Sequence, residues 1–369
     1  MYQTLYTVRK LRYDFQAIFE TNMYPRSVEG IMIAFPAIPS KSAVRLAALI
    51  TLASTCFIPA LRAEDTPSPA LLITGSAGLS IANPQTLQIV ATIPTGVGPH
   101  EIAISPDSKL AMVSTFQGNT ISLIDLKAQK ELDRYKFTFP ARPNSLAFVD
   151  GKFYFTAEDA ASMGRYDPAT KSVDAMIGLG QLTSHVLLYD AANKTFIVTS
   201  RNSNSVTFVD TVNIEYRGNS RPNWRVTPVQ AGITFNEAMD LSPDGKELWT
   251  AEFRGSKVAV LDVATKTVKT TFEVPDLHSD RLKFTPDGKR VLLSDLENGE
   301  LRVIDAATHK EVQKLKIGKG LEGVNITPDG STAFICSPSD GDVSIFDLKT
   351  MTVTGHISVK GALSAVWIP

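Results

Sequence analysis

A short alternating segment that ends in Asp or Asn recurs seven times along this chain of 369 residues. The terminal residues of the seven segments are Asn83, Asp125, Asp167, Asp210, Asp262, Asp305 and Asp347. They follow one another at steps of 42, 42, 43, 52, 43 and 42 residues, so only the fourth step departs from the period. A fixed period of this length is typical of repeat architectures, in which similar units bury their apolar faces against one another.

Each unit contains four short segments in which apolar and polar residues alternate, as β-strands do. The first strand leads into a Ser/Thr-Pro-Asp turn, found at Ser105–Ser108, Ser242–Gly245, Thr285–Gly288 and Thr327–Gly330. Proline presets φ in such a turn, the Asp side chain bonds back to the backbone, and glycine accepts a positive φ. The Asp-ended strand is third, and a turn after it leads to the fourth strand. Four antiparallel strands per repeat, with no helical stretch, predict one blade of a β-propeller.

The two ends of the repeat region complement each other. The first repeat, around Asn83, lacks the Pro-Asp turn and the inner strand that the other repeats have. The C-terminal segment Gly361–Pro369 aligns with Gly320–Pro328, which contains an inner strand. We therefore expect the C-terminal strand to complete the blade formed by residues 70–95, which removes the open sheet edge. The predicted fold class is all-β, a single seven-bladed β-propeller over residues 64–369 in which the N- and C-terminal strands share one blade.

Residues 1–63 are expected to contain an N-terminal extension and a secretory signal peptide. Lys41 and Arg45 precede an apolar run of about 15 residues, shorter than the roughly 20 needed to span a bilayer. Cleavage is expected near Ala63, before an acidic and proline-rich segment. We expect translation to start at Met32, because the residues before it do not fit a normal signal. The prediction is a periplasmic or secreted protein with no membrane span in the mature chain.

Charge and cysteine content exclude several functional classes. Residues 64–369 hold 30 Lys/Arg and 35 Asp/Glu, and this negative balance argues against binding nucleic acid or anionic lipid. Cys56 lies in the segment expected to be removed, so the mature chain has only Cys336 and no intramolecular disulfide. No C-x-x-C-H motif for attachment of haem c occurs. Cys336 lies on a predicted strand, where it is expected to be a small buried residue.

The repeats resemble the YVTN-type β-propeller repeat of bacterial exported proteins, named for a Tyr-Val-Thr-Asn run on the second strand. The corresponding segments here are Met112–Thr115, Tyr154–Ala157, Ile197–Ser200 and Leu248–Ala251. The stretch Gly98–Asp107 and the Asp-ended strands match the repeat as well. The resemblance covers residues 70–369 and implies the propeller fold. It implies no single activity, because the family holds binding proteins, surface proteins and relatives of enzyme subunits.

Aligning the repeats on the Pro-Asp turn places polar residues where the chain enters each inner strand. In a propeller these loops open on one face around the central channel, and we call this set the funnel. The funnel residues are His100, Glu101, Asn144, His185, Asn236, Glu237, His278, Asp280, Arg281, Glu322 and Ser364. Converging imidazoles and carboxylates suit a divalent metal or acid–base chemistry, with His100, His185 and His278 as the candidate metal ligands. A water-filled funnel that accepts a ligand is the alternative interpretation.

Two further surfaces are candidates for partner contacts. The loops after the second strands carry Thr115–Gly118, Glu158–Asp159, Ser200–Asn202, Glu252–Arg254, Asp295 and Glu297. Arg201 and Arg254, beside Phe116 and Phe253, suit an anionic or aromatic ligand, or else are solvated loop tips. The insertion in the fourth repeat carries Tyr216, Arg217, Arg221, Trp224 and Arg225, which are residue types enriched at interface hot spots. An extended outer hairpin explains the insertion equally well.

Three functions remain open from the sequence. The first is an exported, non-catalytic and monomeric scaffold that binds a small ligand or a protein partner at the funnel face. The second is a lactone hydrolase, because seven-bladed lactonases have a similar repeat logic; it would use His100, His185, Glu237, Arg281 and Glu322. The third is a redox role, because the chain resembles propeller subunits of quinone-dependent amine dehydrogenases and the propeller of nitrous-oxide reductase. The cofactor stays open, with a divalent metal as the candidate.

Overall fold

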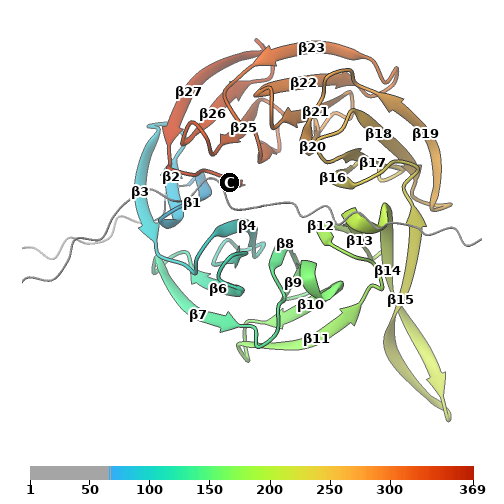
Figure 1. Cartoon of the computed structure of the whole chain (residues 1–369). Helices are drawn as coiled ribbons and strands as arrows, with labels where there is room; N and C mark the ends of the chain where they lie inside the picture. Colours follow the sequence, from blue (N-terminus) through green and yellow to red (C-terminus); the bar gives the residue numbers. More distant parts are fainter. Residues whose placement is uncertain (1–65, 67) are drawn as a thin grey trace, which may run out of the picture. The chain divides into compact units, whose positions relative to one another are not determined.

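Seven four-stranded antiparallel sheets form a ring of blades (Figure 1). The computed structural model describes Thr66 and residues 68–369, and the predicted signal peptide, Met32, Cys56 and Ala63 lie outside them. Within the described part of the chain there are two helical elements, the 3₁₀ turns η1 (Glu158–Ala160) and η2 (Arg201–Ser203). No helix in that part is long and apolar enough to cross a bilayer. The prediction of an all-β, seven-bladed propeller is confirmed.

The blades are numbered 1 to 7 around the ring, and each is given from its innermost strand to its rim. Blade 1 contains β28 (Ala365–Ile368), β1 (Ala70–Gly75), β2 (Gly78–Asn83) and β3 (Gln88–Ile93). Blade 2 contains β4 (Pro99–Ile104), β5 (Leu110–Thr115), β6 (Thr120–Asp125) and β7 (Lys130–Lys136). Blade 3 contains β8 (Pro143–Val149), β9 (Lys152–Ala157), β10 (Ser162–Asp167) and β11 (Ser172–Gly178). Blade 4 contains β12 (Ser184–Asp190), β13 (Thr195–Ser200), β14 (Ser205–Tyr216) and β15 (Asn219–Gln230).

The remaining three blades follow the same order. Blade 5 contains β16 (Asn236–Leu241), β17 (Glu247–Glu252), β18 (Lys257–Asp262) and β19 (Thr267–Glu273). Blade 6 contains β20 (Ser279–Phe284), β21 (Arg290–Asp295), β22 (Glu300–Asp305) and β23 (Glu311–Lys316). Blade 7 contains β24 (Val324–Ile326), β25 (Thr332–Ser337), β26 (Asp342–Asp347) and β27 (Thr352–Ser358).

Pairing of the two ends of the repeat region closes the ring, as the sequence predicts. Strand β28 pairs antiparallel with β1, and the register places Leu72 opposite Val366 and Ala70 opposite Ile368. Ala70, Leu72 and Ile368 also belong to the apolar cluster between blades 1 and 2. The C-terminal strand therefore both covers the edge of β1 and contributes to the core.

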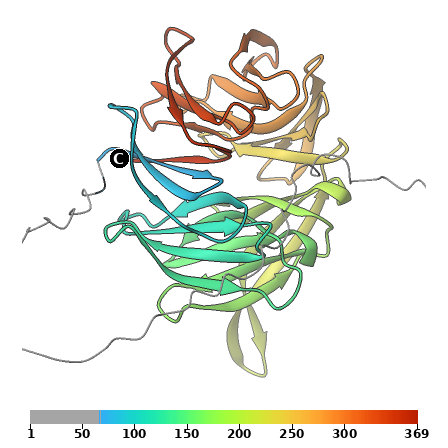
Figure 2. The ribbon, with the colours of Figure 1, turned by 60° about the vertical axis from the view of Figure 1, so that its left-hand side comes forward.

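The Asp that ends each third strand shapes the turn that follows. The Oδ1 atoms of Asp125 and Asp305 each accept a hydrogen bond of 2.8 Å from a backbone N–H three residues later. In blade 4 the chain does not turn at this point, and the carboxylate of Asp210 instead pairs with Arg225 and Lys266. The irregular fourth step of the repeat is thus a long hairpin, β14–β15, which projects from the ring (Figure 2).

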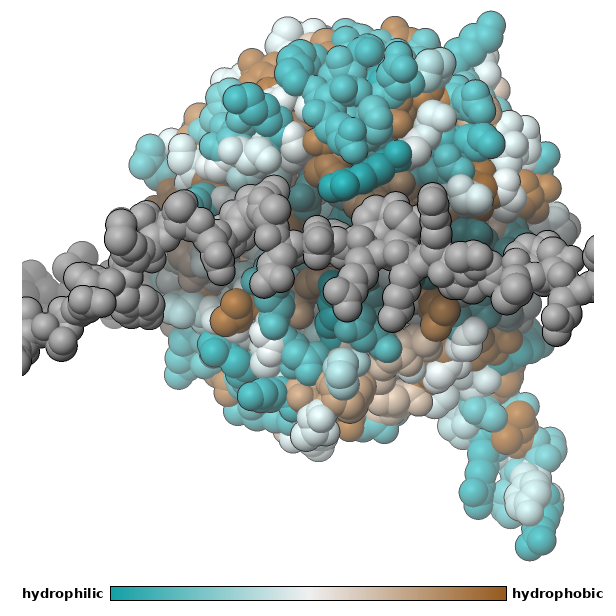
Figure 3. All heavy atoms as spheres, in the orientation of Figure 1, coloured by the Kyte–Doolittle hydropathy of each residue, from teal (hydrophilic) through white to brown (hydrophobic). Residues whose placement is uncertain are grey.

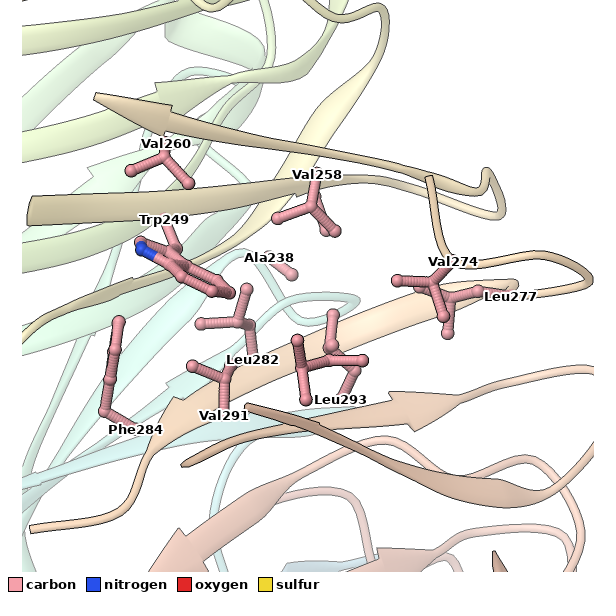
Figure 4. Close-up of a cluster of buried hydrophobic side chains, with 12 residues drawn as sticks. Ala238, Trp249, Val258, Val260, Val274, Leu277, Leu282, Phe284, Val291 and Leu293 are labelled. Carbon is pink, nitrogen blue, oxygen red and sulfur yellow. The ribbon is translucent and has the colours of Figure 1, made fainter. Parts of the chain in front are cut away.

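Apolar side chains fill the spaces between neighbouring blades. Between blades 5 and 6, the fully buried ring of Trp249 lies against Leu282, Phe284 and Val291 (Figure 4). The Trp249 and Phe284 rings meet edge to face, with centroids 5.3 Å apart. Burial of aliphatic and aromatic side chains between the blades is the main stabilising term for such a ring, at about 25 cal/mol per Å² of apolar surface.

Five of the seven inner strands begin with β-bulges, and most funnel residues lie in them. In blade 2, Pro99 is opposite Thr115 and Ile102 is opposite Val113, so His100 and Glu101 share a single partner, Ser114. The same shift occurs at the start of β8, β12 and β20, and a shift of one residue occurs at Glu237 in β16. A bulge bends the strand and redirects its side chains. The funnel side chains therefore depart from the strict inward and outward alternation of a regular strand.

A hydroxyl group on the second strand satisfies the backbone of each of these two-residue bulges. Ser114, Thr156, Thr199 and Ser294 accept hydrogen bonds of 2.9 to 3.0 Å from the backbone N–H groups of Glu101, Ser145, Val186 and Arg281. Thr156 also donates a 2.7 Å hydrogen bond to the backbone carbonyl of His185 in the next blade. The hydroxyls of Thr156 and, by a 3.1 Å hydrogen bond to the Glu237 carbonyl, of Thr199 thus connect the bulges of blades 3 and 4 to the blades that follow.

We expect Thr156→Val to lower the free energy of unfolding by about 1–3 kcal/mol, because the Ser145 N–H and the His185 carbonyl lose this buried partner. Urea denaturation measures the change. Thr156→Ser keeps the hydroxyl and should recover most of the loss. Thr271→Val, on the exposed rim strand β19, is the matched control and should stay within about 0.5 kcal/mol of the parent chain. Equal stability of Thr156→Val and the parent chain would contradict the role given to this hydroxyl.

Candidate functional site

Arg281 connects acidic residues from three blades at the funnel. Its guanidinium lies 2.7 Å from Glu101 of blade 2, 3.1 Å from Asp280 of its own blade and 3.8 Å from Glu237 of blade 5. Glu101 also accepts a 3.0 Å hydrogen bond from the hydroxyl of Ser364, which precedes β28. These contacts cross the ring, so one arginine ties together strands that are far apart in the sequence.

A second arginine extends this cluster on the side of blades 3 to 5. Arg201 pairs with Glu237 and, at 3.0 Å, with Glu158. The Nδ2 of Asn144 lies 3.3 Å from Glu158 and 3.0 Å from the Nε2 of His185, and this Nε2 is 3.4 Å from Glu237. We call these residues, with the Arg281 group, the charged network. Its members are Glu101, Asn144, Glu158, His185, Arg201, Glu237, Asp280, Arg281 and Ser364.

Glu322 is the funnel carboxylate that stands apart from the ion pairs. It lies on the loop before β24, it is partly exposed, and it forms no ion pair with any described Lys, Arg or His. Burial, together with the negative charge of Asp280, raises the pKa of Glu322 to about 8 despite the opposing effect of Arg281. The local environment therefore lacks the positive charge that would stabilise its ionised form.

Burial also raises the pKa of most of the other acidic groups at the funnel. Burial and the nearby Asp280 raise the pKa of Glu237 to about 8. Burial likewise raises the pKa of Glu158 and of Asp280. Glu101 differs, because Arg281 outweighs the effect of burial and lowers its pKa. Five carboxylates thus face two guanidinium groups of the charged network, and four of the five carboxylates are paired with them.

The histidines of the funnel are held neutral or lie outside it. Burial lowers the pKa of His100 to about 4, and burial together with Arg281 and Arg201 lowers the pKa of His185 far below its usual value. The ring of His278 instead lies 3.8 Å from Asp295 and 3.6 Å from Glu297, residues of the loop at the end of its own blade's second strand. The structure therefore does not gather His100, His185 and His278 into one ligand set. Among the described residues, no group of three His, Cys, Asp or Glu side chains is arranged to hold a metal ion.

A cavity of about 210 Å³ occupies the central channel. All seven inner strands or the residues next to them contribute to its wall, in which polar groups stand beside the aliphatic side chains of Ile102, Leu146, Val186, Met239, Leu282, Val324 and Val366. Glu101, Arg281 and Ser364 form part of the lining. The charged network therefore borders a channel with a mixed lining, and a ligand that enters it meets both polar and aliphatic groups.

The other predicted residues are Asn236 and the residues of the β14–β15 hairpin. The Nδ2 of Asn236 donates a 3.1 Å hydrogen bond to the Ser205 carbonyl, and its Oδ1 has no partner among the described residues. On the hairpin, the Arg225 guanidinium is 2.9 Å from Asp210, and the Trp224 ring lies 5.5 Å from the Arg165 guanidinium. Tyr216, Arg217 and Arg221 are exposed on the hairpin (Figure 3), where the surface carries both polar and apolar atoms.

The sequence analysis placed Glu158 and Arg201 on the loops after the second strands, apart from the funnel, and the structure brings them into the charged network. The two residues occupy equivalent positions, one step beyond the second strands β9 and β13. Backbone hydrogen bonds join these positions to the loops that enter the inner strands, from Glu158 N to Arg142 O and from Arg201 N to Thr183 O. The loops after the second strands and the loops into the inner strands therefore lie on the same face of the propeller. From this common face, the proximity of Glu158 and Arg201 to the funnel residues could have been predicted.

Comparisons with known proteins support the fold. No protein-family model and no curated protein matches the chain. Solved structures with the same architecture include a candidate 6-phosphogluconolactonase of Bacteroides uniformis, with 15% identity and a TM-score of 0.66 over 81% of this chain and 99% of that one. A protein of Lactobacillus plantarum matches with 13% identity and a TM-score of 0.66 over 82% and 100% of the two chains. Hydrazine synthase of Kuenenia stuttgartiensis matches with 17% identity and a TM-score of 0.61 over 74% and 90%.

We expect Glu322→Gln to stabilise the protein at pH 9 by about 2 kcal/mol and to have little effect at pH 5. The folded chain keeps a proton on Glu322 up to about pH 8, whereas the unfolded chain loses it near the ordinary value of 4.5. The contribution of this group to stability is therefore lost as the pH rises through that window. Urea denaturation at both pH values measures the effect, with Glu215→Gln on the exposed hairpin as the control. An equal effect of Glu322→Gln at pH 5 and pH 9 would refute this account.

Proposed function

We propose that the protein is an exported, non-catalytic β-propeller that binds, at its funnel, a ligand carrying a positive charge. The observation that carries the proposal is the unpaired Glu322 carboxylate beside a network in which every arginine is already paired with carboxylates. A cation at Glu322 supplies the charge that the five carboxylates lack. The charged N-terminal segment, its apolar run and Ala63 support export to the periplasm or beyond.

Hydrogen-bond acceptors in the same region support a cationic ligand. The buried Oδ1 of Asn144 has no hydrogen-bond donor among the described residues, although its Nδ2 is bonded within the charged network. Organic ammonium and guanidinium groups carry only donors, so carboxylate and amide oxygens suit them. The same charge balance disfavours phosphorylated or otherwise anionic ligands.

The arrangement of the ionisable groups supports binding rather than turnover. The Nε2 of His185 lies between Asn144 and Glu237, and the ring is buried. Arg281 and Arg201 each hold two or more carboxylates, which fixes these side chains in ion pairs and leaves none of them as a free base. Because these side chains already hold one another in ion pairs, the surface that a ligand meets is preformed, and binding costs little side-chain entropy.

We expect the purified chain to bind n-butylammonium with a Kd on the order of 1 mM at pH 9, and about tenfold or more weakly at pH 6. The reason is that the cation binds ionised Glu322, whose proton must leave first at the lower pH. Isothermal titration calorimetry measures the affinity and the released proton. Glu322→Gln should abolish binding, whereas Glu215→Gln should not. Tighter binding of a phosphorylated sugar than of n-butylammonium would overturn the proposal.

A lactone hydrolase is the second candidate, favoured by the 3.4 Å approach of His185 Nε2 to Glu237 beside Arg281. A neutral imidazole paired with a carboxylate suits activation of water. The structural neighbours include candidate 6-phosphogluconolactonases. The leading proposal predicts no hydrolysis of a panel of neutral and phosphorylated lactones in a pH-stat assay. Hydrolysis that disappears in His185→Ala and persists in the control His356→Ala, on the rim strand β27, would replace binding with catalysis.

A further inference from the structure

An arc of exposed apolar residues lies on the loops that enter the inner strands of four consecutive blades. Its members are Val97 (67% exposed), Phe139 (40%), Leu182 (62%) and Phe235 (43%). Each precedes its inner strand by only a few residues, before Glu101, Asn144, His185 and Glu237 in turn. Four of the nine large hydrophobic residues exposed in the described part of the chain thus lie on loops that lead to the charged network, and we call the region where these loops meet the network the acidic mouth. Solvent-exposed apolar surface concentrated in this way marks interaction sites.

An aromatic pocket continues the arc beside blade 2. A hollow of about 500 Å³ is lined by Phe116, Phe137, Phe139, Pro140 and Arg142, together with polar neighbours. Arg142 lies 4.0 Å over the Phe116 ring, and the Phe116 and His100 rings are 5.4 Å apart. His100 is the neighbour of Glu101 in the charged network. The pocket is therefore joined to the acidic mouth by direct side-chain contact.

The arc reaches the charged network again at blade 5. The Arg201 guanidinium lies 5.3 Å from the Phe235 ring and 4.9 Å from the Phe253 ring while it pairs with Glu158 and Glu237. Apolar and charged groups thus alternate from blade 2 to blade 5 across the same face. A small cation fills only the acidic mouth and leaves the arc and the pocket uncovered.

We propose that the occupant of this face is a protein segment that places a Lys or Arg side chain at Glu322 and an apolar or aromatic side chain in the pocket of Phe116 and Phe139. This inference rests on the proposed cation binding and extends it to the class of partner. Glu322, the funnel carboxylate without an ion-pair partner among the described residues, favours a basic side chain, and the aromatic pocket favours an apolar one, so a protein segment that carries both fits the whole face.

The test is selection of a random peptide library, displayed on phage, against the full chain. Enriched peptides should carry both a Lys or Arg and a Phe, Trp or Leu, because the two subsites take one side chain of each kind. Synthetic copies of the enriched peptides should bind at least tenfold more weakly to Glu322→Gln and to Phe139→Ser, and n-butylammonium should compete with them. Val312→Ser, which removes an exposed apolar residue from the rim strand β23, is the matched control and should leave binding unchanged.

The outcomes separate the two proposals. If n-butylammonium binds but the enriched peptides lack a basic residue, or Phe139→Ser binds them normally, the inference about the partner is wrong and cation binding stands. If neither n-butylammonium nor basic peptides bind, both proposals are wrong. Binding to vesicles of phosphatidylcholine and phosphatidylglycerol that is lost in Phe139→Ser would overturn the peptide inference in favour of a membrane surface.

Discussion

The hydrogen bond between a second-strand hydroxyl and the bulged start of an inner strand is the contact on which the funnel depends. Without Ser114, Thr156, Thr199 and Ser294, four backbone N–H groups of the bulges would lack a buried partner. Thr156 and Thr199 also donate to the carbonyls of His185 and Glu237 in the following blades. The same hydroxyls therefore set the conformation of one blade and its distance from the next.

The bulges in turn redirect side chains at the start of the inner strands, and this allows ionisable groups to gather there. Buried carboxylates are costly unless they are paired, and Arg281 meets this requirement for residues of three blades at once. Arg201 does the same for Glu158 and Glu237. Burial and the nearby charge of Asp280 outweigh the arginines at Glu237 and Glu322, and the pKa values of both are raised to about 8.

The blades and their closure could be predicted from the sequence because each depends on local, repeated chemistry. The Asp or Asn that ends the third strand of each blade except blade 4 and the Asp of the Pro-Asp turns accept hydrogen bonds from backbone N–H groups within a few residues, so their spacing reports the strands directly. The pairing of Arg201 with Glu158 could not be predicted, because it joins loops of different blades. His278 lies apart from the charged network because it precedes the bulge of β20, whereas Asp280 and Arg281 lie within it.

Blade 7 shows how a departure from the repeat creates the candidate binding group. Its second strand has Cys336 where other blades have Ser or Thr, and the thiol cannot replace the hydroxyl as a strong partner. The backbone compensates, with Cys336 N donating to the Gly323 carbonyl at 2.8 Å and Glu322 N donating to the Cys336 carbonyl at 3.0 Å. A Cβ at Gly323 would lie 2.5 Å from the Leu363 carbonyl, so this close path requires glycine. Main-chain hydrogen bonds thus hold the backbone at Glu322, and its carboxylate has no ion-pair partner among the described residues.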